Sequence, residues 1–222
     1  MTARRLLAEG LGTGFLAMAA IGAGIMANRL TADPALALLA IGICSGLALF
    51  VLITVMIPVS GGHLNPVVTL TFALRHEITP GLALAYVAAQ ATGAVAGVLA
   101  VHAMFDLPLW QISQTARTGG ALWLSEGIAT FGLILVILGA LAARANVPAI
   151  VGTYIAAAFW FTASSSFANP AVMLARILTD SPGGIRMQDF PGYLAAQILG
   201  TLVAAALGGW LFGRPVPPSE SR

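Results

Sequence analysis

The pair Asn-Pro occurs twice in this chain, each time in a similar setting. The tripeptide Asn65-Pro66-Val67 returns as Asn169-Pro170-Ala171, and each copy follows a run of small residues inside a strongly apolar stretch, Ser-Gly-Gly at 60–62 and Ser-Ser-Ser at 164–166. An Asn side chain caps the free N–H groups of a helix, and Pro fits the first turn because its missing N–H costs nothing there. Each pair therefore predicts the start of a helix.

The first of these helices is short. It can run from Asn65 to about Leu74, before Arg75, which at 1.5 Å per residue gives about 15 Å. That is about half of a ~30 Å hydrocarbon core. A half-helix is tolerated at membrane depth only where its irregular loop is buried in protein or lines a cavity. We expect two half-helices, at about 65–74 and 169–178, beside such a cavity.

The composition indicates an integral membrane protein. Hydrophobic residues make up 59% of the chain and charged residues 8%, whereas soluble domains carry about 25% charged residues. The net charge of +2 comes from ten arginines, which stand singly or in one pair, without the basic patch expected for nucleic acid binding. Cys44 is the only cysteine, so no internal disulfide is possible.

Six apolar runs are long enough to cross a bilayer. With both termini in the cytoplasm, six arginines fall inside and four outside, in agreement with the positive-inside rule; the inner ones are Arg4, Arg5, Arg75, Arg144, Arg214 and Arg222. The end of the chain, about 214–222, is rich in Pro and Ser and is expected to be disordered. The six runs lie near residues 6–27, 35–58, 81–104, 122–143, 147–167 and 190–212.

The chain also repeats itself, as repeat 1 at about 6–104 and repeat 2 at about 122–212 of one transmembrane channel domain, 1–222. Glu9 and Thr13 are echoed by Glu126 and Thr130, and a Tyr-x-Ala-Ala-Gln-like segment follows each Asn-Pro pair. Each repeat holds three spans, an odd number, so the second is inverted. Inverted repeats place their broken helices face to face at the midplane. We expect the two buried acids to bond loop backbone behind each half-helix.

The run Ser-Gly-Gly-His-Leu-Asn-Pro at residues 60–66, with the paired landmarks in order, resembles the aquaporin (major intrinsic protein) family over nearly all of residues 6–212. The resemblance implies an all-α membrane protein with six transmembrane helices, two re-entrant half-helices and an inverted three-helix repeat. It also implies a cell-membrane homotetramer whose subunits each carry a passive pore, without cofactor or metal. The two converging helix N-termini repel cations, and Asn65 and Asn169 offer amide donors to a passing solute.

The resemblance also locates a selectivity filter. Members that select water or glycerol usually carry Arg directly after the second Asn-Pro-Ala, and this chain has Val172 there. By spacing, the other filter positions would be Ser45, Ala157 and Ser166. All four are small or apolar, which implies a wide filter for uncharged solutes larger than water. Val67 stands where the family usually has Ala, so we expect a slightly altered pore wall.

Bacterial members with Asn-Pro-Ala-Val resemble channels associated with metalloids. Glycerol-like polyols and neutral hydroxides such as arsenous acid are therefore the expected solutes, in addition to water. A strictly water-selective channel is the alternative.

Two further residues are candidates for the pore vestibules. Arg176 lies one turn beyond Val172 on the same helix face, so it either guards the outer vestibule or snorkels to the headgroups or pairs with Asp180. His63 stands two residues before Asn65. It either points into the inner pore or holds the loop.

Other classes of protein fit this sequence less well. The Asp residues lie in connecting segments and the His residues are isolated, so neither a catalytic group nor a metal cluster is predicted and the chain is not expected to be an enzyme. An ion-coupled transporter would carry a charged coupling site at the midplane, and none is seen. A closed structural homologue remains an alternative that small pore-lining residues argue against.

Overall fold

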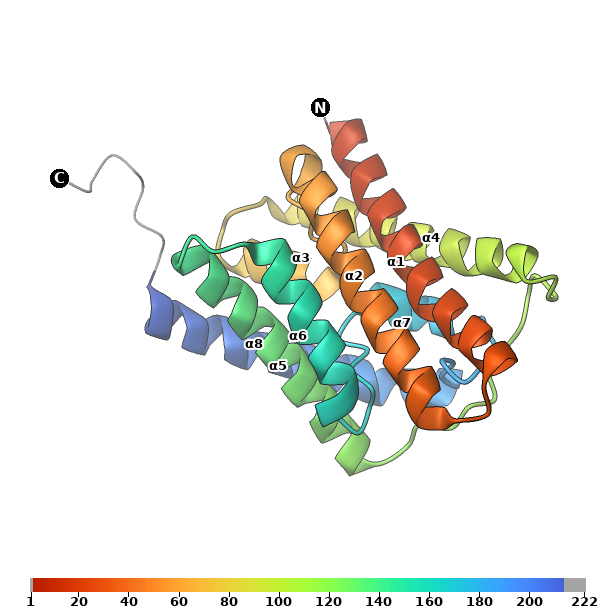
Figure 1. Ribbon diagram of the computed structural model, residues 1–222. Coiled ribbons are helices and arrows are strands. Elements are labelled where there is room, and N and C mark those ends of the chain that lie inside the picture. The colour runs from red at the N-terminus through yellow and green to blue at the C-terminus, as the bar shows by residue number, and fades with distance from the viewer. Residues whose placement is uncertain (1, 214–222) are drawn as a thin grey trace.

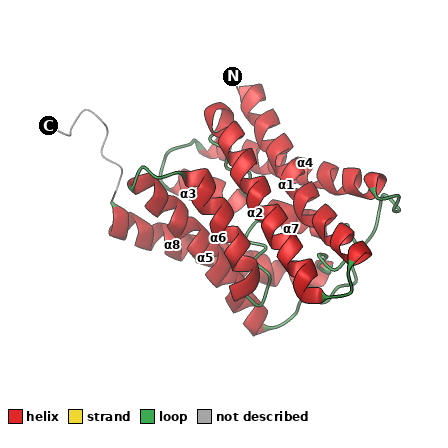
Figure 2. Cartoon of the chain, viewed as in Figure 1, coloured by secondary structure: helices red, strands yellow, loops and turns green. Residues whose placement is uncertain are grey.

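A computed structural model of the chain describes residues 2–213, and within that range the chain forms helices and loops without strands (Figure 2). The expected disordered tail at about 214–222 lies outside the described residues. The helices, in chain order, are α1 Thr2–Leu30, α2 Pro34–Ser60, α3 Pro66–Leu74, α4 Pro80–Met104, α5 Gly120–Ala142, α6 Val147–Phe161, α7 Pro170–Arg176, the short 3-10 helix η1 Met187–Asp189 and α8 Phe190–Phe212.

Caps followed by proline fix where four helices begin. Asp33 accepts hydrogen bonds from two N–H groups of α2, and Thr79 accepts one from α4. Asn65 and Asn169 do the same for the half-helices α3 and α7. In all four, proline stands directly after the cap, where its fixed φ suits the first turn.

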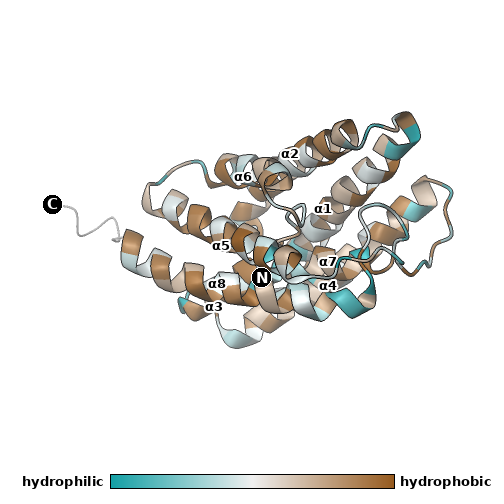
Figure 3. Cartoon of the chain, turned by 90° about the horizontal axis from the view of Figure 1, so that it is seen from below, coloured by the Kyte–Doolittle hydropathy of each residue, from teal (hydrophilic) through white to brown (hydrophobic). Residues whose placement is uncertain are grey.

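The long helices agree with the expected spans, with one exception. Five helices, α1, α2, α4, α5 and α8, are long and apolar enough to cross a membrane, and Figure 3 shows apolar residues along most of their length. The sixth, α6, has 15 residues, or about 22 Å. The prediction that it runs to residue 167 is wrong, because the chain turns extended at Thr162 and left-handed at Ser165 and Ser166. The second half-helix likewise ends at Arg176, not at 178.

The two repeats pack in the same way. In each repeat the first long helix lies against the last, α1 against α4 and α5 against α8, while α2 and α6 join the two repeats. The half-helices α3 and α7 contact each other, and each contacts both α4 and α8. Figure 1 shows them in the middle of the bundle, among the longer helices. This is the predicted fold, with a helix at each of the six expected spans and two half-helices between them.

Glycine allows the first and last helices of each repeat to touch backbone to backbone. A Cβ on Gly93 of α4 would lie 1.9 Å from the carbonyl oxygen of Gly10, and one on Gly200 of α8 would lie 2.4 Å from that of Gly127. Both distances are far below any real contact, so no other residue fits. Small residues at helix crossings serve this purpose in membranes, where helices associate by close packing.

The loop before α3 is held from behind by a buried carboxylate. Glu9 of α1 accepts hydrogen bonds from the backbone N–H groups of His63 (3.0 Å) and Leu64 (2.7 Å), and the amide of Gln90 donates to it at 2.8 Å. Leu64 has a positive φ of 51°, which a branched side chain rarely adopts. The carboxylate therefore stabilises a backbone turn that its own residues disfavour.

The loop before α7 has the same support. Glu126 of α5 accepts from the N–H groups of Phe167 and Ala168, and Gln197 donates to it at 2.7 Å. Ala168 has a φ of 44°. The structure thus places both acids where the sequence analysis expected them, behind the half-helices and fully buried.

Replacement of Glu126 by Ala should lower the stability of the detergent-solubilised protein. The change leaves two buried N–H groups and one amide without an acceptor, which costs roughly 3 kcal/mol, or about 6–12 °C in the midpoint of thermal unfolding for a chain of this size. Glu77→Ala is the control, because Glu77 is exposed and pairs with Arg75 at the surface. It should shift the midpoint by less than a third as much. Equal shifts for both variants would contradict the assigned role.

Candidate functional site

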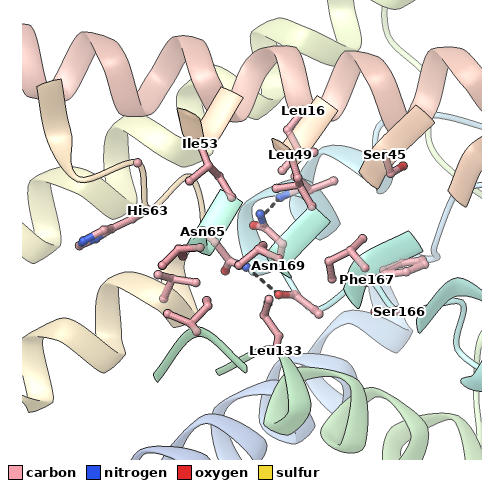
Figure 4. A pocket seen from close by; sticks show the side chains of 18 of the residues that line it. Leu16, Ser45, Leu49, Ile53, His63, Asn65, Leu133, Ser166, Phe167 and Asn169 are labelled. Atoms are coloured by element: carbon pink, nitrogen blue, oxygen red, sulfur yellow. Dashed lines mark hydrogen bonds between the residues drawn. The ribbon is translucent and has the colours of Figure 1, made fainter. Parts of the chain in front are cut away.

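Two asparagines join the half-helices at the centre of the molecule (Figure 4). The side-chain Nδ2 of Asn65 donates to the carbonyl of Ala168 at 2.7 Å, and Nδ2 of Asn169 donates to the carbonyl of Leu64 at 2.9 Å. Each asparagine is thus bonded to the residue that precedes the other. The positive φ values of Leu64 and Ala168 belong to the turns from which these carbonyls project.

The same side chains also cap their own helices. Oδ1 of Asn65 accepts from the N–H of Val67 at 3.0 Å, and Oδ1 of Asn169 accepts from Ala171 and Val172 at 3.1 and 3.2 Å. An amide NH₂ has two hydrogens, and the cross-link uses one. Since both asparagines line the central cavity, each retains one N–H for a solute.

The cavity has a volume of about 270 Å³ and a mostly apolar wall. Its wall is made by rows of residues four apart, because such residues share one helix face. The rows are Ser45, Leu49, Ile53 and Ile57 on α2, Val147, Val151, Ile155 and Phe159 on α6, and Leu133, Ile137 and Leu141 on α5.

The expected filter position on α6 is corrected by this geometry. Ala157 is exposed and does not line the cavity. At about 100° per residue it lies some 200° around the helix from both Ile155 and Phe159, on the opposite face. The spacing rule failed because it assumed a loop of fixed length between α6 and Asn169. An aromatic ring, Phe159, occupies the wall instead.

The second correction concerns Val67. It is buried in the hydrophobic core, and Val68 lines the cavity. The same holds for Ala171, which is buried while its neighbour Val172 lines the cavity. The expectation that Val67 slightly alters the pore wall is therefore wrong, because its side chain does not line the cavity. Pro66 and Pro170 set the first turns of α3 and α7 without lining the cavity.

The other three expected filter residues line the cavity together. Ser45, Ser166 and Val172 are all buried, and Figure 4 shows both serines on the side of the asparagines away from His63. The hydroxyl oxygens of Ser45 and Ser166 have no hydrogen-bond partner within residues 2–213. Both hydroxyls are therefore buried beside the cavity without a protein partner in that range.

Arg176 lines the same end of the cavity. Its side chain is 4% exposed, and its guanidinium carbon lies 4.2 Å from the ring centre of Phe167. Nη1 donates to the carbonyl of Gly183 at 3.2 Å. Snorkelling to the surface and pairing with Asp180 are both ruled out, because the residue is buried and the ion pairs of the described chain do not include it.

His63 marks the other end of the cavity (Figure 4). Its Nδ1 lies 3.1 Å from the hydroxyl of Thr69, and its ring stacks on Phe72 at 4.6 Å between ring centres. The two readings of this residue are therefore compatible, because it lines the wall and is held by the half-helix at the same time.

The sequence analysis missed most of the cavity wall, although a signal existed for two residues close to the asparagines. Val68 stands three residues after Asn65, as Val172 stands three after Asn169; Phe167 stands two before Asn169, as His63 stands two before Asn65. Transferring offsets between the repeats would have found both. Phe159 carries no such signal.

Comparison with known proteins agrees with this geometry. The profile of the family described as Major intrinsic protein matches residues 1–163. The chain is 53% identical over 216 residues to aquaglyceroporin AqpS of Rhizobium meliloti (strain 1021), covering 96% of this chain and 93% of that one. It is 31% identical to aquaporin TIP2-1 of Arabidopsis thaliana, over 95% of this chain and 86% of that one.

A solved structure shares the fold. The crystal structure of the aquaglyceroporin from Plasmodium falciparum superimposes with a TM-score of 0.78 at 24% identity, covering 96% of this chain and 98% of the other. Together with the paired half-helices, these matches show that the chain belongs to the major intrinsic protein family, whose members are channels and not enzymes.

Proposed function

We propose that this chain conducts water and small uncharged solutes passively, among them glycerol-like polyols and neutral metalloid hydroxides such as arsenous acid. The observation that carries the proposal is the wall beside the asparagine junction, where Val172 and two serines stand in place of a fixed charge. The relative of this chain in Rhizobium meliloti is named an aquaglyceroporin. That name supports the proposal that solutes larger than water pass.

The chemistry of the wall suits such solutes. A polyol or a neutral hydroxide loses water when it enters, and a lost hydrogen bond must be replaced. The free N–H groups of Asn65 and Asn169 and the hydroxyls of Ser45 and Ser166 supply replacements along one path. The remaining wall is aliphatic, so a solute is held by few bonds and leaves as easily as it enters.

Coupling to an ion gradient has no support in the wall. Within the described residues, the cavity lining includes no carboxylate. The two acids inside the bundle, Glu9 and Glu126, are both engaged by loop N–H groups. Flux should therefore follow the solute's own gradient.

The strictly water-selective alternative is less well supported. By resemblance to the family, such a filter carries a fixed cation directly after the second Asn-Pro-Ala, and that position is Val172 here. Val172, Ser45 and Ser166 are small and uncharged, although Phe159 adds one ring. The filter we propose comprises these four residues, with His63 at the inner vestibule.

We further propose that the chain is one channel unit over residues 1–222, located in the cell membrane with both termini in the cytoplasm, and that four copies assemble. The arginine distribution supports the orientation. Support for assembly comes from a row of exposed apolar side chains on α2, at positions where a neighbour or lipid must cover them: Leu39, Ile43, Leu47, Val51 and Val55.

Substitution of Val172 by Arg should restrict larger solutes before water. In reconstituted vesicles, light scattering should show glycerol entry for the parent chain and at least tenfold slower entry for Val172→Arg, because the longer cation narrows the wall. Water flux should fall by less than threefold, and direct uptake of arsenous acid should follow glycerol. Parent vesicles that pass water but neither solute would contradict the proposal.

Phe159 and Ala157 offer a matched pair of substitutions on one helix. Phe159→Ala should raise the uptake of polyols larger than glycerol several-fold, because it removes a ring from the cavity wall. Ala157→Val should leave all fluxes unchanged, since that residue faces away from the cavity. The reverse pattern would restore Ala157 as the filter position. Uptake of a radiolabelled polyol series measures both.

The assembly is open to a direct test. Native mass spectrometry of the detergent-solubilised protein should give four copies of the 22.7 kDa chain. A fluorescent protein that matures only in the cytoplasm should be bright when fused to the C-terminus. A monomer in the mass spectrum would contradict the assembly of four copies. A dark fusion beside a bright cytoplasmic control would contradict the cytoplasmic C-terminus.

A further inference from the structure

We propose that Arg176 is the charge filter of this pore, and that it excludes cations and protons in place of the arginine missing at position 172. This inference rests on the proposed channel function and assigns a specificity-determining residue within the same path. Arg176 lies outside the Asn-Pro-Ala tripeptide and its following position, so the fixed charge has been moved along the helix and not lost.

The register of α7 sends the side chain into the path. Val172 and Arg176 are four residues apart, share one helix face and both line the cavity. The Cα atom of Arg176 therefore lies about one turn, or ~6 Å along the helix axis, beyond that of Val172. A solute that passes Val172 also passes Arg176.

The internal repeat gives the same placement independently. Phe72 and Arg176 each stand seven residues after their asparagine, and both line the cavity. At the inner end His63 stacks on Phe72 at 4.6 Å; at the outer end Arg176 lies 4.2 Å from the ring of Phe167. The aromatic and the nitrogen-bearing partner have exchanged positions between repeats. The permanent cation therefore stands at one end only.

The guanidinium has donors to spare. Arginine carries five N–H donors, and this one makes a single hydrogen bond, from Nη1 to Gly183. Its Nε is buried without a partner in the described chain, and no carboxylate there lies within ion-pair distance. An unpaired charge in a surrounding of low dielectric acts strongly on other charges. Its free N–H groups can bond the oxygen of an uncharged solute.

Arg117 provides the contrast that a structural arginine should show. Its guanidinium carbon lies 5.0 Å from the same Phe167 ring, but Nε and Nη2 are both bonded, to the carbonyls of Gly184 and Pro182 at 2.8 Å each. It does not line the cavity. Arg117 is bonded twice to the loop after α7, whereas Arg176 makes one bond to that loop and lines the cavity.

The test compares three variants of the full chain in proteoliposomes. Arg176→Gln removes the charge, Arg176→Lys keeps it, and Arg117→Gln removes a neighbouring charge outside the path. Proton leak is followed with a trapped pH dye under a potassium diffusion potential, and glycerol entry by light scattering. Arg176→Gln should raise the proton leak at least tenfold while glycerol still enters. The proton leak of Arg176→Lys and of Arg117→Gln should stay within twofold of that of the parent chain.

Arg176→Met covers the case in which Gln does not fold, because Met keeps the length of the stem and brings no buried polar atom. The proton leak of Arg176→Met should match that of Arg176→Gln. Unchanged proton leak in a charge-removing variant that still conducts glycerol would overturn this inference alone, as would equal leak for Arg117→Gln. A parent chain that conducts no solute would instead overturn the proposed function.

Discussion

The hydrogen bonds that join Asn65 to Ala168 and Asn169 to Leu64 are the constraint from which the rest of the structure follows. They hold two helix N-termini together inside a bundle, where backbone groups without partners are costly. The carbonyls that accept these bonds come from residues with positive φ, which only a firmly held loop retains. Each repeat therefore needs a side chain that supports its loop from behind, here called a brace, and these are Glu9 and Glu126. The helices that carry the braces must pack closely to bring them to the loops.

The braces explain why acids survive inside a membrane protein. Glu9 and Glu126 each collect two backbone N–H groups and the amide of a glutamine from another helix of the same repeat. A carboxylate satisfied by several donors is tolerated where an isolated one is not. Glycines let α1 pack closely on α4 and α5 closely on α8. This brings Gln90 and Gln197 within hydrogen-bond distance of the two glutamates. The loops, braces and crossings form one arrangement, used twice.

The sequence predicts this arrangement well where the signal is local. A cap followed by proline marks four helix starts, and length with hydropathy marks the spans. It predicts less well where the outcome depends on loop geometry. No residue of 162–167 marks the end of α6, because all six are small or apolar and compatible with a helix. The number of loop residues between α6 and Asn169 was therefore misjudged, and spacing from Asn169 placed the filter at Ala157. Val67 was misplaced because its buried side depends on how α3 packs, which no local pattern specifies.

The two repeats are built alike, and a few side chains make the two ends of the cavity different. Val68 and Val172 are the same residue at equivalent positions, so the region around the asparagines stays symmetric. Two residues before each asparagine and seven after it, the halves differ: His63 with Phe72 at one end, Phe167 with Arg176 at the other. Each pair stacks, so the same backbone accommodates either order. The fold can thus hold a permanent charge at one end of the cavity and an imidazole ring at the other end. The proposed charge filter therefore depends on which member of a stacked pair stands on the half-helix, and on how many of its donors the loop leaves without a partner.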